Sequence, residues 1–313
     1  MSSRFPAVVA GVDGYDLAAA AAAAATAVAR RRLLPVRLVR AFDRPVPSPG
    51  AGPVPPGREA ARRAALAALG DLRETLLRQY PGGQITTALV EGTAAEVLLE
   101  ETASAELLVL GPHGAAPSSG VLGRVRVEVV RRAPCPVLCA AVPSGRVVDG
   151  PVVALVDPRD AATSSRLLST ALLEATTRGS DLEVVDLSRT GGPVGPAGTG
   201  LAAAVERMGR AAPGVRIRCR RPDDPSGRHL GPAERGAQLL VVGRGDPAGA
   251  LPPVLRAVLS QAGVPVLLVP PAAAPLARAP VLALSLAPGR AGDPDRRPER
   301  SDLSPTDRSE YGR

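Results

Sequence analysis

The stretch Ala7-Val-Val-Ala-Gly-Val-Asp13 decides the fold, because its apolar residues run without interruption into an acid that is followed by Gly14. A continuous apolar run of this length is typical of a strand buried on both faces, as in parallel sheets. The Ala-rich residues 17–32 that follow have strong helix propensity. The stretch therefore predicts a buried strand that ends at Asp13 and leads directly into a helix.

Strands and helices are expected to alternate over the rest of the first half. Thr93-Ala-Ala-Glu96 is a capping box that opens one of the helices. Residues 44–57 are rich in Pro and Gly and must form a loop. The other expected strands are residues 33–42, 85–90, 107–110 and 136–141, and the other expected helices are residues 58–80 and 123–132. Five strands alternating with helices predict an α/β fold with a doubly wound parallel sheet of strand order 3-2-1-4-5.

The same order of elements then starts again, which predicts a second, shorter copy of the unit. Val152-Val-Ala-Leu-Val-Asp157 resembles the first strand, and its run again ends in an acid. Two further segments, residues 239–243 and 264–269, resemble residues 107–111 and 135–140. We expect one domain at residues 1–143, a second at residues 150–271, and a disordered tail rich in Pro and Arg at residues 272–313, in which residues 281–286 could add one edge strand.

Composition excludes several classes of protein. The chain has 313 residues and a net charge of +8, all 38 basic residues are Arg, and aromatic residues make up 2%. A basic surface favours nucleic-acid binding, but these Arg residues are scattered and few aromatic rings are available to stack on bases. No apolar segment reaches the roughly 20 residues of a membrane span. We expect a cytoplasmic protein that binds neither nucleic acid nor membrane.

The reactive residues are few. Cys135 and Cys139 lie in one strand-like segment, about 13 Å apart by strand geometry, whereas a disulfide needs Cα atoms within about 7 Å. We expect both to be core residues, and with only two His in the chain we expect no metal site. No Ser–His or His–carboxylate pair stands out, and a P-loop needs a Lys that the chain lacks. The sequence therefore predicts no dedicated enzyme, and at most a slow ATP hydrolase.

Two separate signals converge on one crevice of the predicted sheet. Ligands of doubly wound sheets sit where neighbouring strands send their crossovers to opposite faces, here between the first and fourth strands. Asp13 ends the first strand, and Gly111-Pro-His-Gly114 ends the fourth. Glycines allow close backbone approach, and the free N–H groups of the next helix favour phosphate. Asp13 can accept hydrogen bonds from a ribose hydroxyl or a base amine.

These residues give the chain a resemblance to a known family. The motifs are Gly11-Val-Asp13-Gly14, Leu107-Leu-Val-Leu-Gly-Pro-His-Gly114 and Ala133-Pro-Cys-Pro-Val-Leu138. With them the chain resembles a tandem universal stress protein, well over residues 5–142 and more weakly over residues 150–271. The resemblance implies two sheets of the adenine nucleotide alpha hydrolase-like type, a stress-response function, and a homodimer as one possible assembly.

The resemblance also implies a ligand, ATP with magnesium, in the first half. Nucleotide-binding members carry a Gly, two residues, a Gly, nine residues, and a Gly followed by Ser or Thr. In this chain the interval before the last Gly is eight residues, and Arg occupies the Ser/Thr position, where it could pair with a phosphate. The residues that would hold the nucleotide are Val12, Asp13, Gly111, His113, Gly114, Gly123 and Arg124.

The second half departs further from this pattern. After Gly243 come Arg244, Gly245, Asp246 and Pro247, so the glycine spacing is broken and an acid stands where phosphate would lie. We expect this half to be structural. The resemblance suggests that it pairs with the first half, and the apolar fifth strands at residues 135–141 and 264–269 are the candidates for that contact. Two hypotheses stay open for the whole chain: a stress-response protein that binds ATP in its first half, and a scaffold of the same fold that acts through protein contacts.

Overall fold

The computed structural model describes residues 6–13, 18–43, 57–112, 120–142, 149–157, 161–188, 200–221, 232–245, 253–261 and 263–271. The chain divides into two units, Met1–Ala279 and Pro280–Arg313, and every described residue belongs to the first unit. The expected edge strand at residues 281–286 and the expected disorder of the tail lie outside the described residues. The division of the chain near residues 143–150 stays a prediction.

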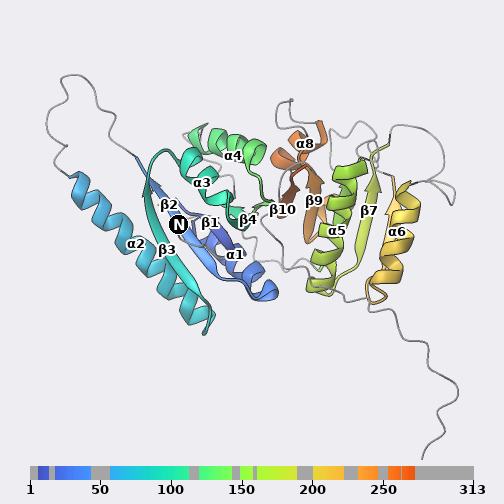
Figure 1. The fold of residues 1–313 in the computed structure, drawn as a ribbon, viewed down its shortest axis with the longest axis horizontal. Coiled ribbons are helices and arrows are strands. Elements are labelled where there is room, and N and C mark those ends of the chain that lie inside the picture. Colours follow the sequence, from blue (N-terminus) through green and yellow to red (C-terminus); the bar gives the residue numbers. More distant parts are fainter. Residues whose placement is uncertain are drawn as a thin grey trace, which may run out of the picture. The chain divides into compact units, whose positions relative to one another are not determined.

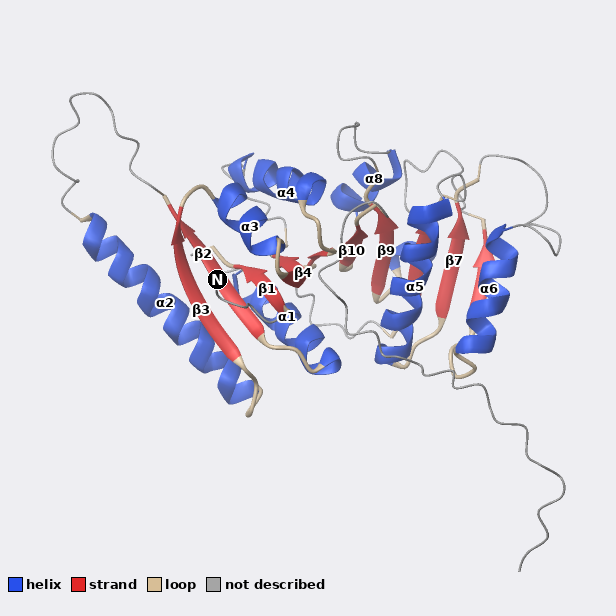
Figure 2. Cartoon of the chain, viewed as in Figure 1, coloured by secondary structure: helices blue, strands red, loops and turns tan. Residues whose placement is uncertain are grey.

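Strands and helices alternate in the first half as the sequence predicts (Figures 1 and 2). Its strands are β1 (Ala7–Gly11), β2 (Val36–Phe42), β3 (Ile85–Glu91), β4 (Ala105–Leu110) and β5 (Val137–Cys139). Its helices are α1 (Ala18–Arg32), α2 (Arg58–Gln79), α3 (Ala94–Thr102) and α4 (Gly120–Arg132). The expected helix at residues 123–132 thus begins earlier, at Gly120.

The second half repeats this order with shorter elements. Its strands are β6 (Val152–Val156), β7 (Leu182–Asp186), β8 (Ile217–Arg220), β9 (Leu239–Gly243) and β10 (Val266–Val269). Its helices are α5 (Ala161–Arg178), α6 (Gly200–Ala211), α7 (Pro232–Arg235) and α8 (Pro253–Gln261). Where the first half has α3, the described part of the second half has α7, which is four residues long.

The ten strands form one sheet in the order β3-β2-β1-β4-β5-β10-β9-β6-β7-β8. Counted within its own half, each set of five has the order 3-2-1-4-5, which confirms the predicted fold class. Among the described strands, β5 and β10 are the one antiparallel pair, with Val266 opposite Cys139 and Leu267 opposite Leu138. The two fifth strands therefore join the halves, as the resemblance suggests, and neither strand is left as an open edge.

The alternation of side chains along β1 divides the interior into two layers. Val8 and Ala10 pack with α1 and α2 on one face, whereas Val9 packs with α3 and α4 on the other, and Figure 1 shows these helix pairs on opposite sides of the sheet. In α1 the buried residues are mostly Ala, including the fully buried Ala21 and Ala22. Small side chains bring α1 close to the sheet, so the core is built almost without aromatic rings.

Buried ion pairs join the halves along the face that carries α1 and α5. Arg32, at the end of α1, donates from Nη2 to Oε1 of Glu174 on α5 at 2.5 Å. Arg178 donates from Nε to the other oxygen of Glu174 at 3.0 Å. Glu106 of β4 lies 4.0 Å from Arg32, and its side chain is only 10% exposed. The charges of Arg32, Glu174 and Arg178 lie in the interior, where each needs the others as partners.

Cys135 and Cys139 are core residues as the sequence predicts, although Cys139 ends β5 whereas Cys135 precedes this strand. Cys135 and Cys139 are buried in the core as free thiols, and Cys219 is partly buried and also free. Burial raises the pKa of Cys135 to about 12 and also raises that of Cys139, so both remain protonated thiols.

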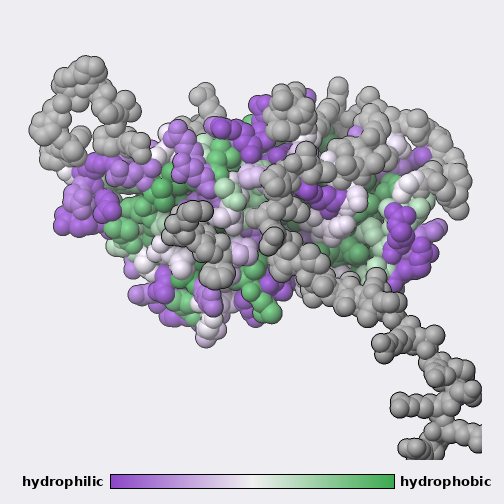
Figure 3. Space-filling view, in the orientation of Figure 1, coloured by the Kyte–Doolittle hydropathy of each residue, from purple (hydrophilic) through white to green (hydrophobic). Residues whose placement is uncertain are grey.

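The outer helices present polar surfaces. Figure 3 shows hydrophilic side chains over α2 and α6, which flank the two outermost strand pairs, β2–β3 and β7–β8. Among them are the exposed Arg62 and Arg63 of α2 and the exposed Glu206 and Arg207 of α6. None of the described helices combines the length and the apolar character that crossing a membrane would require.

Candidate functional site

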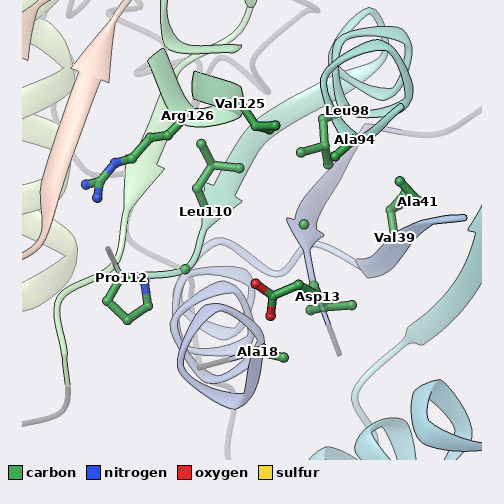
Figure 4. Close-up of a pocket in the computed structure, with 13 residues that line it drawn as sticks. Asp13, Ala18, Val39, Ala41, Ala94, Leu98, Leu110, Pro112, Val125 and Arg126 are labelled. Atoms are coloured by element: carbon green, nitrogen blue, oxygen red, sulfur yellow. The ribbon is translucent and has the colours of Figure 1, made fainter. Parts of the chain in front are cut away.

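A pocket lies at the carboxyl ends of β1 and β4, where the following helices leave toward opposite faces of the sheet. This is the point at which doubly wound sheets bind ligands. Its volume is about 140 Å³. Figure 4 shows the residues that line it, which are Gly11, Val12, Asp13, Ala18, Val39, Ala41, Ala94, Leu98, Leu110, Gly111, Pro112, Val125 and Arg126.

Most of the wall is apolar. Leu98 of α3, Leu110 of β4 and Val39 of β2 form its larger surfaces, with Ala41 and Ala94 beside them (Figure 4). An apolar wall of this kind suits a flat ring rather than a charged group.

Gly11 keeps the pocket open at its centre. A Cβ atom at this position would lie 2.9 Å from Cδ2 of Leu98, closer than ordinary packing allows. A side chain here would therefore push the end of the Leu98 side chain aside.

Asp13 is the one carboxylate among the described residues that line the pocket. The backbone N–H of Val12 donates to the carbonyl oxygen of Val39 at 2.9 Å, which holds the chain in the sheet up to the residue before Asp13. Figure 4 places the Asp13 carboxylate beside Ala18, at the start of α1. It can accept hydrogen bonds from a hydroxyl or amine of a ligand whose ring lies on the apolar wall.

Arg126 is the one cationic residue among the described lining residues, and it faces away from Asp13 (Figure 4). Its Nε donates to Sγ of Cys139 at 3.2 Å. The Asp13 carboxylate therefore lies on the side of the pocket near α1, and the Arg126 guanidinium lies on another side (Figure 4).

The sequence-predicted residues fall into three groups. Val12, Asp13 and Gly111 line the pocket. Gly123 lies in α4 and lines a different cavity, together with Pro112 and Arg126. His113 and Gly114 lie outside the described residues, as does the side chain of Arg124. Their part in a site stays a prediction.

Sequence reasoning missed the contribution of α3. Thr93 accepts a hydrogen bond from the backbone N–H of Glu96, and Glu96 accepts one from the N–H of Thr93, so the predicted capping box is present. This box fixes the first turn of α3 and places Ala94 and Leu98 against the pocket. The capping motif could have located this wall, because it starts a helix directly after the third strand.

The corresponding place in the second half is occupied by protein groups. Gly243 ends β9, and a Cβ atom on it would lie 3.1 Å from Cγ2 of Thr163 on α5. The next residue, Arg244, is 4% exposed and donates to the carbonyl oxygen of Ala133 in the first half. These contacts favour the expectation that the second half is structural. Among the described residues, no three His, Cys, Asp or Glu side chains gather as a metal would require.

The first half of the chain matches a known protein family. The model of the universal stress protein family matches residues 5–141. Residues 5–141 therefore form a universal stress protein domain. The matched segment contains β1 to β5 and therefore the whole described wall of the pocket.

Solved structures extend the likeness in fold to both halves. A universal stress protein from Archaeoglobus fulgidus aligns over 85% of this chain and 96% of its own, at 13% identity and a TM-score of 0.58. A protein of unknown function from Pseudomonas aeruginosa aligns over 86% of this chain and 93% of its own, at 18% identity and a TM-score of 0.52. At such identities the likeness shows the fold alone.

A third solved structure holds a nucleotide. It is a universal stress protein from Archaeoglobus fulgidus in complex with dAMP, which aligns over 44% of this chain and 98% of its own. The identity is 21% and the TM-score 0.31. No curated protein sequence matches the chain significantly.

Proposed function

We propose that the chain is a stress-response protein that binds one adenine nucleotide, ATP, in the pocket of its first half. The observation that carries the proposal is the placement of Asp13 beside an apolar pocket at the switch point between β1 and β4. Membership of residues 5–141 in the universal stress protein family supports it.

The base would occupy the pocket itself. A site that encloses a small-molecule ligand usually has about 300–1,000 Å³, so a volume of about 140 Å³ fits one part of a nucleotide rather than the whole molecule. The apolar surfaces of Leu98 and Leu110 would contact the ring. Asp13 would accept hydrogen bonds from the ribose hydroxyls or the base amine.

The phosphates would then lie beyond Gly111, over the segment that leads to α4. Free N–H groups at a helix start and a glycine-rich turn both favour phosphate. By their place in the sequence, His113, Gly114 and Gly123 would approach the phosphates, and the guanidinium of Arg124 would pair with one of them. Magnesium would be held chiefly by the phosphates and water, because it keeps several waters when it binds nucleotides.

Thermal unfolding with and without excess ATP and magnesium tests this function. A ligand at about 100 times its Kd stabilises the native state by roughly 2.7 kcal/mol. At about 2–4 °C per kcal/mol for a chain of this size class, the unfolding midpoint rises by about 5–10 °C.

The variants Asp13→Asn and Asp157→Asn form a matched pair, because each acid follows the first strand of its own half. We expect the rise to shrink in Asp13→Asn and to persist in Asp157→Asn. No rise at millimolar ATP in the unaltered chain would contradict nucleotide binding, and the scaffold hypothesis would then lead.

A further inference from the structure

A second, larger cavity lies beside the pair β5–β10, between α4 of the first half and α8 of the second. Its volume is about 580 Å³, which is within the range of about 300–1,000 Å³ that small-molecule sites occupy. The described residues that line it are Pro112, Gly123, Arg126, Val127, Ala140, Ala141, Val142, Arg256, Val258, Leu259, Gly263, Val264 and Val266.

The wall of this cavity gathers apolar side chains that the fold leaves uncovered. Val142 is 54% exposed and Val127 is 39% exposed, and both belong to the few large hydrophobic residues of the described chain that face solvent. Valines exposed singly need no explanation. Two of them in the lining of one cavity give it apolar surface for the body of a ligand.

The charged residues among the described lining of this cavity are both arginines. Arg126 and Arg256 line it, and none of its described lining residues is acidic. Arg126 makes one hydrogen bond within the described part of the chain, from Nε to the thiol sulfur of Cys139, which is a weak acceptor. Burial raises the pKa of Cys139, so the thiol does not supply a balancing negative charge.

The guanidinium of Arg126 is held in a position from which it can bind an anion. Its hydrogen bond to Cys139 fixes the inner end of the guanidinium, and Figure 4 shows the terminal nitrogens turned away from Asp13. A guanidinium fixed at one edge presents its remaining N–H groups in a fork that matches carboxylate or phosphate oxygens.

We propose that this cavity binds a small organic anion that has an apolar body and one anionic group. The apolar body would cover Val127, Val142 and Leu259, and the anionic group would lie between Arg126 and Arg256. The cavity shares Pro112 and Arg126 with the wall of the nucleotide pocket, but the apolar surface of Val127, Val142 and Leu259 belongs to this cavity and not to that pocket.

Two fluorescent probes with one apolar body test the proposal. Anilinonaphthalene sulfonate carries one negative charge, and N-phenylnaphthylamine is its uncharged counterpart. We expect the full-length protein to bind the sulfonate at least about tenfold more tightly, as the loss of a charge-assisted hydrogen bond implies. Decanoate, a non-fluorescent carboxylate with an apolar chain, should displace the sulfonate.

Two variants, each with a matched control, test whether the probe binds in this cavity. Arg256→Gln should weaken sulfonate binding about tenfold and leave the neutral probe unaffected, whereas Arg62→Gln on the exposed face of α2 should change neither. A Cβ atom at Gly263 meets no other atom within 4 Å, so Gly263→Leu places a side chain in the open cavity. It should abolish binding of both probes, and Gly214→Leu, at another open and exposed glycine, should not.

Equal affinity for the charged and neutral probes would overturn the proposed anion site. So would sulfonate binding that survives Gly263→Leu in a variant whose thermal midpoint matches the parent, because the probe would then lie elsewhere.

Discussion

Arg244, the residue after β9, donates a hydrogen bond through its guanidinium to the carbonyl oxygen of Ala133, the residue after α4. The contact links the two halves in the buried interior, since Arg244 is 4% exposed. A cation at the carboxyl end of a helix is favourable because the last carbonyl groups carry partial negative charge. Arg244, which follows the glycine that ends β9, therefore has a structural part.

Replacing Arg244 by Met should destabilise the chain. Removing the donor leaves the carbonyl of Ala133 without this partner, and the cost of such a loss is about 1–3 kcal/mol. Part of it is offset because the buried guanidinium no longer has to be desolvated, the effect that lowers the pKa of Arg244. We expect a net loss of about 1–2 kcal/mol in urea unfolding, and little change in Arg210→Met on the exposed face of α6. Equal or higher stability of Arg244→Met would mean that desolvation dominates.

The free energy of unfolding should decrease as pH rises, because of Glu106. Burial raises the pKa of its carboxyl from 4.5 to about 7, although Arg32 opposes the shift. Between these values the unfolded chain ionises while the folded chain keeps the proton, so the free energy of unfolding decreases as pH rises from about 4.5 to about 7. At about 1.4 kcal/mol per pKa unit the decrease is at most about 3 kcal/mol.

The variant Glu106→Gln isolates that contribution. Urea unfolding measured across the same pH window should show a flatter profile in Glu106→Gln than in the parent. The control Glu128→Gln, whose carboxylate is 46% exposed, should keep the parent's slope. A parallel profile in Glu106→Gln would show that other groups cause the pH dependence.

Filling the pocket should weaken nucleotide binding without unfolding the protein. Ala41 lines the pocket, and Ala41→Leu would place an added side chain against the space proposed for the base. We expect the affinity for ATP to fall by tenfold or more, because one additional apolar group in a fitted site costs about 1–3 kcal/mol. Calorimetric titration measures this effect. Ala68→Leu on the exposed side of α2 is the control, and unchanged affinity in Ala41→Leu would exclude this pocket.

The capping box of α3 should affect both stability and binding. Thr93→Ala removes the side chain that accepts from the N–H of Glu96, which costs about 1 kcal/mol of stability. Because α3 carries Ala94 and Leu98 to the pocket, the stabilisation by ATP should also decrease. Thermal unfolding with and without ATP measures both effects. If Thr93→Ala lowers stability but ATP still raises the midpoint as much as in the parent, the capping box does not contribute to the site.

The fold could be predicted from the sequence because its signals are local. The apolar runs at residues 7–13 and 152–157 each indicate a buried strand, and the order of runs and helices repeats. Parallel strands with right-handed crossovers then leave few arrangements. The ends of the elements follow less directly from the sequence. Helix α4, for example, begins at Gly120 rather than at Gly123.

The site could be predicted only in part, because its walls come from distant segments. Asp13 and Gly111 end strands whose order the fold class fixes, so their convergence followed from topology. Arg126 and Leu98 reach the pocket from the middle of helices, and their direction depends on how α3 and α4 pack on the sheet. The contact between Arg244 and Ala133 joins residues 111 positions apart, and no sequence pattern marks it.

The stoichiometry of ATP binding, measured by calorimetric titration of the full-length chain with magnesium present, tests the central claim most directly. The account predicts one ATP per chain, with the heat of binding lost in Asp13→Asn and retained in Asp157→Asn. Two equivalents per chain, or one equivalent that depends on Asp157 rather than Asp13, would contradict it.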